Sequence, residues 1–68
     1  MRQSNDETVE VTLHVHAETA RAMLLSLDGE EKHAEWTPKS QITHMGAEKG
    51  ESGVFELREW IAKKNGFI

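Results

Sequence analysis

The sequence contains no cysteine and no tyrosine, only one proline, and two residues each of tryptophan and phenylalanine among 68 residues. The absence of cysteine excludes disulfides, thiolate metal ligands and thiol nucleophiles, and it suits a reducing compartment. No apolar run approaches the roughly 20 residues of a membrane-spanning helix, and the polar start from Met1 to Thr8 is unlike a secretory signal. We therefore expect a cytoplasmic protein that does not engage a membrane.

The short chain limits the size of the hydrophobic core. A domain of this length buries only about 60% of the surface that its unfolded chain exposes. We expect a flexible N-terminal segment, residues 1–8, followed by one small domain, residues 9–68. A homodimer would be a physically sensible way to enlarge so small a core.

The charge is acidic overall and unevenly distributed, with a formal net charge of −4. Residues 1–35 hold eight Asp and Glu against three Lys and Arg, whereas residues 36–68 hold four against five. General binding to a phosphate backbone needs clustered cations, so this balance argues against it. An acidic surface suits a basic protein partner instead, because complementary charge speeds their encounter.

The first half of the chain predicts strands. Apolar and polar residues alternate strictly from Thr8 to Ala17, which is typical of a half-buried strand. The next segment, Ala22 to Leu27, fits either a strand or one helical face. The Asp28-Gly29 pair that follows favours a strand, paired through a tight hairpin turn with a second strand that spans residues 30–37 and is ended by Pro38.

The second half predicts a turn, two short strands and a helix. Lys39–Gln41 is expected to form a tight or 3₁₀ turn, Thr43–Met45 a short strand and 46–53 a flexible glycine-rich loop. After a last strand at Val54–Leu57, the helix is expected to span Glu59–Asn65. Gly66 then provides a left-handed stop, and Phe67 folds back on Ile61 or Ala62.

These elements predict an α+β fold: a strongly bent antiparallel sheet or open barrel of four or five strands, closed by one short C-terminal helix. The residues expected in its core are apolar and fall on one face of each element. They are Val11, Leu13, Val15, Met23, Leu25, Leu27, Trp36, Ile42, Val54, Phe55 or Leu57, Trp60, Ile61 and Phe67.

Two motifs carry a resemblance that covers about residues 22–67. They are Trp36-x-Pro38-Lys39-Ser40-Gln41-Ile42 and Glu59-Trp60-Ile61-Ala62-x-x-x-Gly66, after an apolar strand that ends in Asp-Gly-Glu. With them the chain resembles a group of short proteins encoded by bacteriophages and prophages, which has no assigned activity. The resemblance implies an accessory protein of DNA metabolism or counter-defence in a bacterial host cell, and it transfers no catalytic residues.

Four carboxylates form the first candidate site. Asp28, Glu30, Glu31 and Glu35 would line the expected hairpin and could imitate spaced phosphates. They would then occupy the basic nucleic-acid-binding surface of another protein, as an anti-CRISPR-like inhibitor of a host complex does. Charge on a hairpin also serves simply to prevent pairing between sheet edges.

The alternative is a small barrel that binds single-stranded nucleic acid. Such barrels stack bases on aromatic side chains within a cationic groove. The residues available for this role are Trp36, Lys39, Gln41, Lys63 and Lys64. The competing interpretation places Trp36 in the core and makes residues 38–41 a turn whose polar groups bond locally.

The four histidines prompt a metal or catalytic interpretation, which the sequence does not favour. His14 and His16 would project from one face of a strand and could bind Zn²⁺ or Ni²⁺ if His33, His44 or a nearby Glu completed the ligand set. The polar face of an amphipathic strand explains the pair equally well. Because no nucleophile motif or phosphate loop is present, we expect no enzyme activity, no metal and no cofactor.

Overall fold

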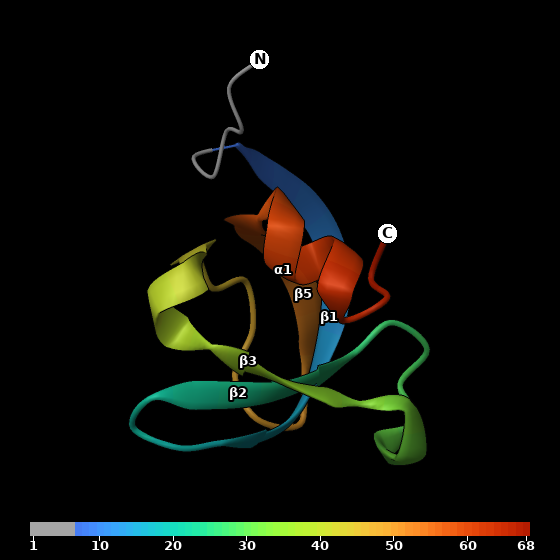
Figure 1. Ribbon diagram of the computed structural model, residues 1–68. Helices are drawn as coiled ribbons and strands as arrows, with labels where there is room; N and C mark the ends of the chain where they lie inside the picture. The colour runs from blue at the N-terminus through green and yellow to red at the C-terminus, as the bar shows by residue number, and fades with distance from the viewer. Residues whose placement is uncertain (1–6) are drawn as a thin grey trace.

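The computed structural model describes residues 7–68. They form one open antiparallel sheet of five strands and a short C-terminal helix (Figure 1), so the predicted α+β class is confirmed. The elements are β1 (Thr8–Glu18), β2 (Ala22–Ser26), η1 (Glu31–His33), β3 (Glu35–Pro38), η2 (Lys39–Gln41), β4 (Ile42–His44), β5 (Ser52–Arg58) and α1 (Glu59–Lys64), η denoting a 3₁₀ turn. Of the predicted flexible segment 1–8, residues 1–6 lie outside the described residues.

The long strand β1 organises the sheet, whose strand order is β3-β2-β1-β5-β4. Its first part, from Thr8 to His14, pairs with β5, and its last part pairs with β2. The register shifts between Val15 and Ala17, which leaves His16 as the extra residue of a β-bulge. Figure 1 shows β2 and β3 running across the lower ends of β1 and β5, so the sheet is strongly bent.

The core lies between the inner face of this bent sheet and α1. Its members are the inward-facing residues of β1, β2, β4 and β5 together with one face of the helix. The buried apolar side chains are Leu13, Val15, Met23, Leu25, Ile42, Phe55, Leu57, Ile61, Ala62 and Phe67. Val11 is partly buried against them.

Four residues predicted for the core are instead exposed. The exposed fractions are 51% for Leu27, 49% for Trp36, 48% for Val54 and 39% for Trp60. Val54 directly precedes the buried Phe55 in β5, so strand alternation directs its side chain to the opposite face. Trp60 lies on the surface of α1, where its indole Nε1 donates to Oε1 of Gln41 at 3.2 Å.

Trp36 faces outward because its neighbour Thr37 occupies the inner position of β3. Thr37 is fully buried, and its hydroxyl accepts a hydrogen bond of 3.2 Å from the side-chain amide of Asn65. The same amide donates to the carbonyl of Trp36 at 3.4 Å, which joins the end of α1 to this strand. A buried polar group is tolerated when it is hydrogen-bonded, so threonine takes the place predicted for tryptophan.

The connection between β2 and β3 is not the predicted tight Asp-Gly hairpin. The strand predicted from residue 30 begins only at Glu35, and η1 precedes it. Gly29 has a positive φ of 78°, and its N–H donates to the hydroxyl of Ser26 at 3.1 Å. The Asp28-Gly29 pair therefore starts a longer loop that ends in a 3₁₀ turn.

The glycine-rich segment 46–53, predicted as a flexible loop, makes ordered backbone contacts. Gly50 N–H donates to the carbonyl of Val15 at 2.8 Å, and Val15 N–H donates to the carbonyl of Glu51 at 2.9 Å. A turn closes from Glu51 N–H to the carbonyl of Glu48, with Gly50 at φ 88°. Glycine suits the third position of such a turn because it adopts positive φ without steric cost.

The predicted helix end is confirmed. Gly66 has φ 78°, its N–H bonds the carbonyl of Lys63 at 3.2 Å, and Phe67 N–H bonds the carbonyl of Ala62 at 2.8 Å. These two bonds define a Schellman motif. The motif turns the chain so that the Phe67 side chain enters the core, which secures a helix of only six residues.

Candidate functional site

The predicted carboxylates lie along the loop that leads into β3. Glu30, Glu31 and Glu35 are exposed, and no hydrogen bond or ion pair engages their side chains within the part of the chain that the structure describes. We call these three residues the acidic rim. Asp28 differs, because both of its carboxylate oxygens bond within the loop.

Asp28 holds the loop in shape. Its Oδ1 accepts the backbone N–H of Glu30 at 2.9 Å, and its Oδ2 lies 2.6 Å from Nδ1 of His33. The hydrogen bond from Glu30, followed by the interaction with His33, lowers the pKa of Asp28 below its usual value of 3.8. The role of Asp28 on this surface is therefore to fix the loop that presents the other carboxylates.

The lowered pKa gives a pH prediction. Because the native loop favours the ionised carboxylate, this contribution to folding is complete above pH 3.8 and is lost as the pH falls through the lower pKa of the folded protein. A ¹³C NMR titration of the Asp28 carboxyl should give a midpoint below that of a peptide spanning residues 26–35. Equal midpoints would show that the loop does not hold this carboxylate.

An apolar row crosses the outer face of the sheet beside the acidic rim. Trp36 on β3 lies directly opposite Leu24 on β2, and Leu24 lies opposite Ala17 on β1. Met23, Leu25 and Thr37 are buried on the inner face, so alternation places this row on the outer one. We call Trp36, Leu24 and Ala17 the tryptophan patch.

The sequence analysis missed Leu24 and Ala17 as surface residues. Their alignment with Trp36 depends on the bulge at His16, because without the shift Leu24 would oppose a different residue of β1. The signal available in the sequence was the alternation of Met23, Leu24 and Leu25, which places Leu24 opposite to the core. Tryptophan is enriched at protein-binding surfaces, where aromatic anchors supply much of the affinity.

The alternative nucleic-acid set is only partly assembled. The ammonium of Lys39 pairs with the carboxylate of Glu18, and Gln41 accepts the Trp60 indole N–H. Lys63 lies 3.7 Å from Glu59 in the same helix. Lys39 and Lys63, two of the three cations of the set, are thus each close to a carboxylate. The set therefore does not form a continuous cationic groove beside Trp36.

The histidine pair forms two serine contacts on the outer face. The His14 and His16 rings lie 4.7 Å apart between centroids. Nδ1 of His14 lies 2.8 Å from the Ser52 hydroxyl, and Nε2 of His16 lies 2.7 Å from that of Ser26. Ser26 is fully buried and also accepts Gly29 N–H, so its contact joins the bulge to the loop rather than presenting a nucleophile.

No group of three metal-ligating side chains gathers within residues 7–68. The two imidazoles at positions 14 and 16 therefore stand without a third ligand in the described part of the chain. Four ligands, or three and a water, are what zinc sites require. The described residues thus offer no ready-made metal centre.

No protein-family model, no curated protein and no solved structure matches the chain. Among the described residues there is no helix long and apolar enough to cross a membrane. The resemblance to short phage-encoded proteins therefore stays a prediction. The properties of the tryptophan patch and the acidic rim are what bear on function.

Proposed function

We propose that this protein acts by binding another protein through the tryptophan patch, without catalysing a reaction. The half-exposed indole of Trp36 in an apolar cross-strand row carries the proposal. A large aromatic ring that faces solvent exposes apolar surface to water, which is unfavourable, and it contributes little to the hydrophobic core. Such a ring is favourable when a partner covers it.

The charge around the patch defines the partner as basic. Glu30 and Glu31 lie in the loop that leads into β3, whereas Glu35 directly precedes Trp36 and projects from the other face of this edge strand. A polar rim around an aromatic anchor sets specificity and encounter rate. A basic surface of a nucleic-acid-handling or host-defence complex has the complementary charge, and occupying it would inhibit that complex, as expected of a phage-type accessory protein.

Affinity capture from host lysate tests this proposal. The tagged protein is incubated with nuclease-treated and untreated lysate, and retained proteins are identified by mass spectrometry. We expect one defined basic protein to be retained equally in both arms. The triple variant E30K/E31K/E35K should lose at least tenfold of that protein, because each reversal turns attraction into repulsion.

The matched control is Glu10→Lys, which reverses a carboxylate of β1 opposite Glu56, and it should retain the partner. Direct binding of a labelled single-stranded oligonucleotide is measured in parallel. Retention of partner by the triple variant, or oligonucleotide binding that weakens with salt together with loss of all proteins after nuclease, would contradict the proposal.

A further inference from the structure

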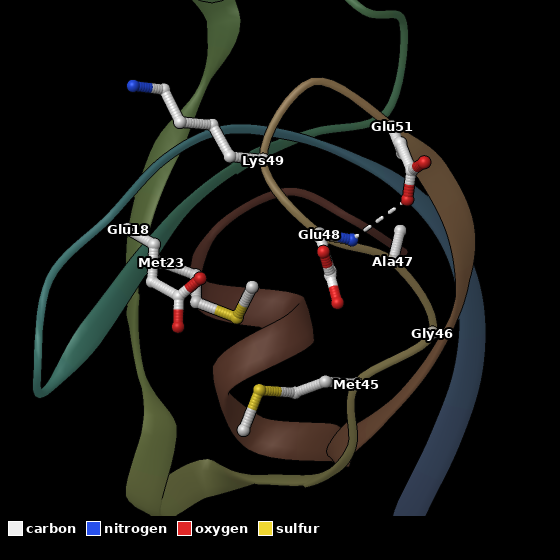
Figure 2. Close-up of a pocket in the computed structure, with 8 residues that line it drawn as sticks. All are labelled: Glu18, Met23, Met45, Gly46, Ala47, Glu48, Lys49 and Glu51. Carbon is white, nitrogen blue, oxygen red and sulfur yellow. Dashed lines mark hydrogen bonds between the residues drawn. The ribbon is translucent and has the colours of Figure 1, made fainter.

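A hollow lies on the inner face of the sheet, which is the face opposite to the tryptophan patch. It has a volume of about 780 Å³ and opens between the end of β1 and the loop that joins β4 to β5 (Figure 2). Two methionines and several carboxylates line it. The volume is in the range of ligand-binding pockets, which is roughly 300–1,000 Å³.

The apolar part of the hollow comes from Met23 and Met45. Met23 is fully buried and reaches the hollow from the core, whereas 46% of Met45 is exposed. Figure 2 shows both thioethers on one side of the space. Methionine is flexible and polarisable, so such a floor adapts to an unbranched aliphatic chain.

The polar part is acidic. Figure 2 shows the carboxylates of Glu18 and Glu48 directed toward the space above the thioethers, whereas Lys49 extends away from it. The ammonium of Lys39 already pairs with Glu18. Neither Glu48 nor Glu51 has an ion pair within the described residues, but Oε1 of Glu51 accepts the backbone N–H of Glu48 at 3.4 Å. The carboxylate of Glu48 is therefore the one left free for a cationic ligand.

We infer that this hollow binds the lysine or arginine side chain of a basic peptide segment. The aliphatic stem of such a side chain would lie on the exposed side chain of Met45, next to the buried Met23, and its cationic head would meet Glu48. Long basic side chains bury their stems on apolar surface while the charged head stays near solvent or a counter-ion. The inference is independent of the tryptophan patch, since the two surfaces share no residue.

The closed turn that lines the hollow holds Glu48 in a fixed position. Glu51 N–H donates to the carbonyl of Glu48 at 2.9 Å, and Glu48 N–H donates to Oε1 of Glu51 at 3.4 Å. The turn is joined to β1 through Gly50 and Val15. The carboxylate of Glu48 is therefore presented from an ordered segment, which lowers the entropic cost of binding.

The test is an NMR titration of the full-length protein with two probe peptides, acetyl-Gly-Lys-Gly-amide and its norleucine counterpart. Norleucine keeps the stem and lacks the ammonium. We expect saturable shifts of the Met23 and Met45 methyl signals with the lysine peptide and at least tenfold weaker binding of the norleucine peptide. Glu48→Gln should weaken lysine-peptide binding at least fivefold.

The control is Glu10→Gln, which removes a carboxylate remote from the hollow and should bind as the wild type does. Equal affinity for the two peptides, unchanged binding by the Glu48→Gln variant, or the absence of saturable methionine shifts would each overturn the inference. Loss of the captured partner in the triple acidic-rim variant, with these shifts intact, separates this site from the proposed function.

Discussion

Replacing Gly46 with alanine is expected to destabilise the protein strongly. A Cβ added at Gly46 would overlap the carbonyl oxygen of Val54 and lie 2.6 Å from its carbonyl carbon. Both atoms belong to the backbone of β5, which cannot yield as a flexible side chain does. We expect a loss of about 3 kcal/mol, at the upper end for overpacking, which is a large part of the stability of a small domain.

Thermal unfolding followed by circular dichroism measures this effect. A loss of that size should lower the Tm by roughly 15 °C in a domain of this length. Gly53→Ala should behave similarly, because its Cβ would come within 2.7 Å of the carbonyl carbon of Gly46. The control is Gly50→Asn, since Gly50 has open space around it and asparagine tolerates positive φ. A Gly46→Ala protein as stable as the control would disprove the close approach.

Replacing Trp36 with alanine is expected to abolish partner binding while leaving the fold intact. Tryptophan anchors at interfaces commonly contribute about 2 kcal/mol or more, so affinity should fall at least 30-fold. Stability should fall by only about 1 kcal/mol, because half of the side chain is already in solvent. Surface plasmon resonance with the captured partner measures the first effect, and urea unfolding measures the second.

Trp60→Phe provides the matched control for this variant. It changes the other half-exposed indole and its hydrogen bond to Gln41, yet it lies on the helix, away from the tryptophan patch. It should bind as the wild type does. Full binding by Trp36→Ala, or conversion of a dimer into a monomer by this substitution, would assign the patch to self-association or to no interface.

The elements that the sequence predicted correctly are those whose signal is local. The alternation from Thr8 to Ala17 predicted β1, and the spacing from Trp60 to Phe67 predicted both the helix and its Schellman motif. The choice of strand over helix for β2 is also confirmed. In each case the residues that decide the structure lie within a few positions of one another.

The failures come from contacts between residues far apart in the sequence. Thr37 replaces Trp36 in the interior because Asn65, 28 residues later, supplies the hydrogen bond that a buried hydroxyl needs. Gly46 packs against the backbone of Val54, and Gly53 packs against the backbone of Gly46. The composition of this segment predicts only a flexible loop. Neither partner can be identified before the fold is known.

The candidate site was predictable only in part, because its spatial grouping also depends on contacts between residues far apart in the sequence. Charge counting identified the carboxylates, but it did not separate Asp28, which bonds within its own loop, from the three free members of the acidic rim. The tryptophan patch requires the cross-strand register that the bulge at His16 sets. The sequence therefore predicted which residue types lie on this surface, but not how they are grouped in space.

Site-specific photo-crosslinking tests the central claim most directly. A benzoylphenylalanine is placed at Ala22, which lies on β2 two residues from Leu24 and opposite Pro38. In the control it is placed at Glu10, which lies about 23 Å along β1 from Ala17 at roughly 3.3 Å per residue. Irradiation in nuclease-treated lysate should yield one defined protein adduct from position 22 and none from position 10. Adducts of equal yield from both positions, or none from position 22, would contradict binding through the tryptophan patch.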